Sequence, residues 1–123
     1  MNYFLVAIGA AVGGTLRYIL SSSFPTTGGN SFPWTTLAIN IFGSLILGLI
    51  IQLASGRNMI SEELKIFLTV GFCGGFTTFS TFSFETFSLF QSGEMLRGIL
   101  YIGASNTLSI LAAFGGYAIG KNV

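Results

Sequence analysis

The chain has 123 residues, of which 51% are hydrophobic and only 7% are charged, and its mean hydropathy is +0.78. A soluble domain carries about 25% charged residues, so this composition excludes a soluble fold and indicates an integral membrane protein of one domain. The net charge of +1, without a basic run, argues against nucleic-acid binding; one cysteine and no histidine exclude an intrachain disulfide and the usual zinc ligand sets.

Four segments are long and apolar enough to cross a bilayer, which takes about 20 mostly apolar residues. They lie at about residues 2–22, 33–54, 62–91 and 94–120. The N-terminus lacks a basic region followed by a small-residue cleavage site, so we expect the first segment to be a span and not a signal peptide. The sequence therefore predicts an all-α membrane protein, with residues 1–123 forming a single domain of four transmembrane helices.

The linkers between the spans carry helix-boundary signals. Residues 21–33 are rich in Ser, Thr, Gly and Pro, and Pro33 can begin the second helix because a first-turn amide needs no helical partner. Ser61, followed by Glu62 and Glu63, is typical of an N-cap with acidic first-turn residues.

Small residues recur four apart in every span, a spacing that lets helix backbones approach closely in lipid. We interpret them as packing positions and not as sites: Gly9 and Gly13, Ser44 and Gly48, Gly71 and Gly75, and Gly116 and Gly120.

Two polar residues stand out in the first two spans. Arg17 is the first charge in the chain, and interface anchoring and a buried structural role are about equally compatible with its position. Asn40 lies near the middle of an apolar helix, where its amide could bond across a helix interface or donate to an anion.

Residues 71–85, in the third span, hold three glycines, five hydroxyl side chains, five phenylalanines and one carboxylate. Lipid does not tolerate this composition on an exposed face, so we expect the run to be buried or to line an ion path. The pair Gly74-Gly75 indicates either a broken helix, whose free carbonyls could hold a cation, or a continuous helix with a tight crossing.

After these glycines, aromatic and hydroxyl side chains form neighbouring stripes at helical spacing. Phe76, Phe79 and Phe82 make the aromatic stripe, and phenyl ring edges are positive enough to face an anion. Hydroxyls can donate to the same anion, although aromatic packing with hydroxyls bonded to their own helix is the alternative. The hydroxyls that could form a polar track with the fourth span are Ser80, Thr81, Ser105 and Ser109, with Asn106 and Thr107 adding polarity on other faces.

Glu85 is the one carboxylate well inside a span, and it could carry a proton, bind a cation or accept hydrogen bonds structurally. Four spans place both termini on one side of the membrane, together with Arg57, Lys65 and Lys121, against Arg97 and Arg17 on the other. This charge bias is weak. It is compatible with insertion both ways round and antiparallel assembly, or with one fixed orientation.

The chain resembles the Fluc (CrcB) family of fluoride channels over essentially its full length. The resemblance is strongest across residues 71–85 and is supported by the runs at 14–18 and 36–40. It implies an antiparallel, dual-topology homodimer with a broken third helix, in the cell membrane of a prokaryote. The implied activity is passive, selective export of fluoride, which lowers cytoplasmic fluoride and its toxicity.

The resemblance also implies roles for individual residues. A structural sodium ion would be held at the dimer interface by the backbone carbonyls of Gly74 and Thr77, and Arg17 and Glu85 match charged positions that are commonly present. Phe76 departs from the leucine of many relatives, which we expect to affect packing more than selectivity. The implied fluoride pore is lined by Asn40, Phe79, Ser80, Thr81, Phe82, Ser105 and Ser109.

Other function classes are less compatible with the sequence. A proton-coupled small multidrug exporter would need a carboxylate open to a wide chamber, and phenylalanines crowd Glu85. A packing subunit without transport activity would not need the hydroxyl stripe. An enzyme is disfavoured because the chain has no histidine, no paired carboxylates and no set of nucleophile and base.

Overall fold

In the computed structural model, which describes residues 1–25 and 31–123, every regular element is helical. The linker expected at 21–33 includes residues 26–30, which lie outside the described residues. In chain order the elements are α1 (Asn2–Ser23), α2 (Trp34–Ile51), the π-helical segment η1 (Gln52–Gly56), α3 (Glu62–Ile66), the π-helical segment η2 (Phe67–Cys73), α4 (Gly74–Phe76), α5 (Ser80–Gln91) and α6 (Met95–Lys121).

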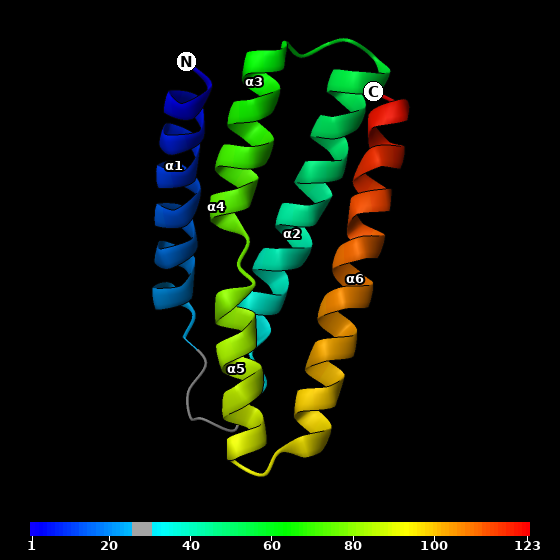
Figure 1. Ribbon diagram of the computed structural model, residues 1–123. Helices are drawn as coiled ribbons and strands as arrows, with labels where there is room; N and C mark the ends of the chain where they lie inside the picture. Colours follow the sequence, from blue (N-terminus) through cyan, green and yellow to red (C-terminus); the bar gives the residue numbers. More distant parts are fainter. Residues whose placement is uncertain (26–30) are drawn as a thin grey trace.

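These elements form four columns that run along a common direction (Figure 1). The four stretches that are long and apolar enough to cross a membrane are Asn2–Ser23, Trp34–Gly56, Glu62–Gln91 and Met95–Lys121. The prediction of an all-helical protein with four spans is therefore confirmed. Both termini lie at the end of the bundle where α3 begins, as four spans require (Figure 1).

The columns associate in two closely packed pairs. Helix α1 packs along η2 and α4, and α2 packs along α6. Both contacts depend on glycine, because a Cβ atom on Gly13 would collide with the Phe72 carbonyl, and one on Gly48 with the Ala113 carbonyl. The interpretation of the glycines as packing positions is confirmed, since the backbones meet where a side chain is missing, whereas their small neighbour Ser44 lines the cavity described below.

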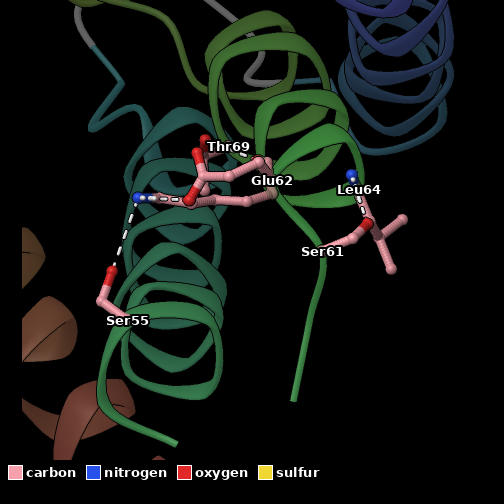
Figure 2. A network of polar contacts seen from close by, with 6 residues as sticks. Ser55, Ser61, Glu62, Leu64 and Thr69 are labelled. Carbon is pink, nitrogen blue, oxygen red and sulfur yellow. Dashed lines mark hydrogen bonds and ion pairs between the residues drawn. The ribbon is translucent and has the colours of Figure 1, made fainter. Parts of the chain in front are cut away.

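The third column begins with the predicted N-cap. The Ser61 hydroxyl accepts a hydrogen bond from the Leu64 amide at 3.2 Å, and Glu62 and Glu63 occupy the first turn of α3 (Figure 2). Lys65 then reaches back to the preceding segment, with its Nζ 3.4 Å from Ser55 Oγ. The N-cap predicted at Ser61, with its acidic first turn, is confirmed.

One buried cluster lies where α2, α5 and α6 meet. It comprises Leu37, Phe82, Leu89 and Tyr101, and Tyr101 is fully buried. The cluster fixes α5 against α2 and α6, and thereby positions the polar groups described next.

Candidate functional site

The third column is interrupted by a non-helical segment between α4 and α5 (Figure 1). Helix α4 ends at Phe76, Thr77 has an extended backbone (φ −79°, ψ 160°), and α5 begins at Ser80. The Asn40 side chain, on α2, holds this segment at two points: its Nδ2 donates to the Thr78 carbonyl at 3.1 Å, and its Oδ1 accepts from the Thr78 amide at 2.8 Å. Asn40 thus replaces the helical partners that Thr78 lacks.

The non-helical segment leaves two backbone carbonyls without their helical donors. In a continuous helix the amide of Thr78 would donate to Gly74 O, but here it donates to Asn40. Likewise the Thr81 amide, which would donate to Thr77 O, donates at 3.1 Å to the Thr78 hydroxyl. The Gly74 and Thr77 oxygens are therefore available to another ligand.

A third carbonyl at the end of α4 is occupied from outside the helix. Arg17 Nε, on α1, donates to Gly75 O at 3.1 Å. Arg17 is half-buried, and of the two roles left open for it, this contact favours the structural one. A cation at the carboxyl end of a helix also interacts favourably with the helix dipole.

The glycine pair does not itself form the non-helical segment. Gly74 has helical dihedral angles (φ −62°, ψ −37°), and Gly75 is helical and lies against Ala10 of α1, whose carbonyl oxygen would be 2.6 Å from an added Cβ. Of the two alternatives left open at Gly74-Gly75, the tight crossing describes the glycines themselves, because Gly75 packs on Ala10. The helix ends after them, where side-chain hydrogen bonds replace backbone ones.

A small cavity of about 210 Å³ lies beside this segment, between α2, α5 and α6. No charged side chain is among its described lining residues. The lining consists of Asn40, Ser44, Thr77, Thr78, Phe79, Phe82, Ser105, Asn106, Ser109 and Ile110. Five of the seven residues expected to line a pore are thus brought together.

Two serine hydroxyls on α6 lack a hydrogen-bond partner among the described residues. The Oγ atoms of Ser105 and Ser109 are buried, and neither has a hydrogen bond within the described part of the chain. A buried hydroxyl without a partner is costly, so each is free to donate to something that enters the cavity.

The two phenylalanines of the lining lie at the start of α5. The ring centroids of Phe79 and Phe82 are 5.4 Å apart and the rings are tilted by 52°. Phe82 is only 8% exposed and packs on Tyr101, whereas Phe79 is 75% exposed. One ring is therefore fixed by the core, and the other leaves the cavity open on the surface of the single chain.

The predicted stripes differ from the structure in two respects. Phe76 does not continue the stripe of Phe79 and Phe82, because it belongs to α4, where it is 2% exposed and stacks on Phe72 with centroids 5.6 Å apart. The expectation that it serves packing is consistent with this position. Ser80 and Thr81 lie outside the cavity lining, and Ser80 Oγ is 3.5 Å from the Thr78 hydroxyl.

Glu85 lies in a separate polar contact that joins three helices. Its two carboxylate oxygens accept from Thr36 Oγ1 at 3.0 Å and from Tyr101 Oη at 2.8 Å. Of the roles considered for Glu85, the structure favours a structural acceptor. Sequence reasoning missed Tyr101, since nothing local marks a tyrosine whose partner is 16 residues away.

Four apolar columns, three of which line a small cavity with neutral donors, define a small multi-pass membrane protein with a polar site midway along its spans. The chain belongs to the CrcB family, whose model, described as "CrcB-like protein, Camphor Resistance (CrcB)", matches residues 4–117. The resemblance seen in the sequence is confirmed.

Similar proteins cover nearly the whole chain. A protein of Agrobacterium fabrum is 44% identical over 123 residues, which is 100% of this chain and 98% of that protein. Relatives from Thermus thermophilus (46% over 119 residues, 97% and 93%) and Geobacter sulfurreducens (43% over 111 residues, 90% of each) are comparable. All three are named "Fluoride-specific ion channel FluC". With four candidate spans and these bacterial relatives, the chain is a multi-pass protein of the cell membrane.

Proposed function

We propose that this protein is a fluoride-selective ion channel that lets fluoride leave the cell passively, and so lowers cytoplasmic fluoride and its toxicity. The observation that carries the proposal is the cavity at membrane depth, whose lining includes the buried, unpartnered hydroxyls of Ser105 and Ser109. The names of the relatives, all fluoride-specific ion channels, support the same ion.

The chemistry of the lining suits a small, strongly hydrated anion. Such an ion enters only where donors replace its water, and it leaves only where they do not bind it too tightly. Asn40 contributes the Nδ2 hydrogen that its bond to Thr78 leaves free, and the two serine hydroxyls contribute further donors. The edges of Phe79 and Phe82 are weakly positive, and no fixed cation in the described lining would trap the ion.

Liposome efflux tests this function. Purified protein reconstituted into liposomes loaded with potassium fluoride should release fluoride rapidly to an external fluoride electrode once an ionophore carries the potassium. Empty liposomes give the background. Release at the background rate would refute the proposal.

We further propose that the working unit is an antiparallel, dual-topology homodimer with two fluoride pores. Phe79 is largely exposed and the cavity is open in the single chain, so a second copy is a suitable lid. The weak charge bias between the two ends of the bundle supports insertion in both orientations. The dimer can be tested by light scattering in detergent, and the topology by the accessibility of a C-terminal tag from both sides of the membrane. A monomer, or a tag reached from one side only, would contradict it.

A structural sodium ion at the dimer interface is the third part of the proposal. The Gly74 and Thr77 oxygens fit this role because their helical donors are engaged elsewhere, and carbonyl oxygens are the ligands that sodium prefers at a membrane midplane. A bound ion would supply a fixed positive charge that holds the two copies together, and would not itself be transported. The thermal midpoint should rise with sodium and not with choline at equal ionic strength; equal midpoints would contradict the site.

A further inference from the structure

Asn106 directly follows Ser105 in the sequence of α6, and it lines the same cavity as Ser105 and Ser109. The residue is exposed in the single chain, although it sits midway along a helix of membrane length. Amide groups that are left without partners in hydrocarbon are costly, so this side chain favours a polar environment. The cavity beside it offers polar groups, among them Asn40, Ser105 and Ser109.

The amide of Asn106 is partly committed, and its orientation is fixed. Its Nδ2 donates to the Ile102 carbonyl at 2.9 Å, one turn earlier on the same helix. A carbonyl oxygen can pair only with the NH₂ side of an amide, so this bond identifies which end of the side chain carries the donors. One Nδ2 hydrogen remains free.

Asn40 has the same arrangement on the other wall. Its Nδ2 also uses one hydrogen for a backbone carbonyl, that of Thr78, and retains the second. The cavity is thus lined by one amide from α2 and one from α6, each held by the backbone and each with one donor to spare.

We propose that Asn106 is a second amide ligand of the permeating fluoride ion, acting together with Asn40 of α2 and with the hydroxyls of Ser105 and Ser109. This inference rests on the proposed function. The Asn106 amide adds a donor that raises the rate of fluoride permeation. This face of α6 therefore forms part of the pore.

The matched control is the next residue along the helix. Thr107 is also polar and exposed, but it does not line the cavity. A general need for polarity on α6 would make both positions sensitive, whereas a ligand of the ion makes only Asn106 sensitive.

The test compares initial fluoride release from liposomes at low internal fluoride, where the rate reports binding and barrier together. Asn106→Leu should release fluoride about tenfold more slowly than the wild type, as the loss of one hydrogen bond to a charged group implies. Asn106→Asp should be slower still, because it replaces the donors with a negative charge. Thr107→Val should stay within about twofold of the wild type. Elution volume and thermal midpoint establish that each variant is folded and in the same oligomeric state.

Wild-type release by Asn106→Leu, or equal slowing by Thr107→Val, would overturn the role of Asn106 and leave the proposed function intact. Loss of the wild-type oligomer in Asn106→Leu would also overturn it, and would assign the residue to the contact between copies. A wild-type protein that releases no fluoride would refute the proposed function itself.

Discussion

Replacing Asn40 with alanine should destabilise the protein through the backbone of Thr78. Asn40 makes two hydrogen bonds to that residue, at 2.8 and 3.1 Å, and Thr78 is only 9% exposed. A side-chain hydrogen bond between membrane helices contributes about 1–2 kcal/mol in favourable cases, so we expect Asn40→Ala to lower the free energy of unfolding by about 2–4 kcal/mol.

The loss can be measured by reversible unfolding in mixed micelles titrated with sodium dodecyl sulfate. Ser44→Ala is the matched control, because Ser44 lies one turn further along α2 and lines the same cavity. The hydrogen bonds described for the segment between α4 and α5 do not involve Ser44. It should change stability by less than about 0.5 kcal/mol. Hydrogen exchange adds a local readout, since the Thr78 amide should exchange faster in Asn40→Ala. If the two variants were equally stable and Thr78 exchanged at the wild-type rate, Asn40 would not hold the segment between α4 and α5.

Three further outcomes follow from the packing and the cavity. Gly48→Ala should destabilise the α2–α6 pair by about 1–3 kcal/mol, because its Cβ would collide with backbone, while Gly103→Ala, with open space around it, should not; equal stabilities would contradict the packing. Arg17→Leu should lower the thermal midpoint because Gly75 O loses its donor, and an unchanged midpoint would show that the contact contributes nothing. Phe82→Ile should slow fluoride release relative to Phe87→Ile, an exposed position on the same helix outside the cavity lining; equal rates would argue against a role for the ring edge.

Local composition was sufficient for much of this architecture. The four spans follow from apolar runs of bilayer length, and the start of α3 follows from Ser61 and the two acidic residues after it. The close helix pairs follow from small residues four apart. In each case the signal lies within a few residues of the feature that it predicts.

The interior of the site depends on partners that are distant in sequence. Thr78 and Asn40 are 38 residues apart, and Arg17 is 58 residues from Gly75, so neither pairing could be read from spacing. The sequence left open whether Gly74-Gly75 breaks the helix or makes a tight crossing; in the structure Gly75 packs on α1, and Asn40 holds the non-helical segment that follows.

The same limitation applied to the aromatic stripe. The three-residue period includes Phe76, but α4 ends at that residue, whereas Phe79 is the N-cap of α5 and Phe82 lies within it. A period read from sequence holds only while the helix continues. The contact between Glu85, Thr36 and Tyr101 likewise appears only once three helices have packed together.

The central claim is that a cavity of neutral donors passes fluoride and excludes larger anions. The most direct measurement loads the same liposomes with equal concentrations of fluoride and chloride and follows both ions with selective electrodes after reconstitution. The account predicts rapid release of fluoride while chloride stays inside. Release of both ions at similar rates, or of neither, would contradict it.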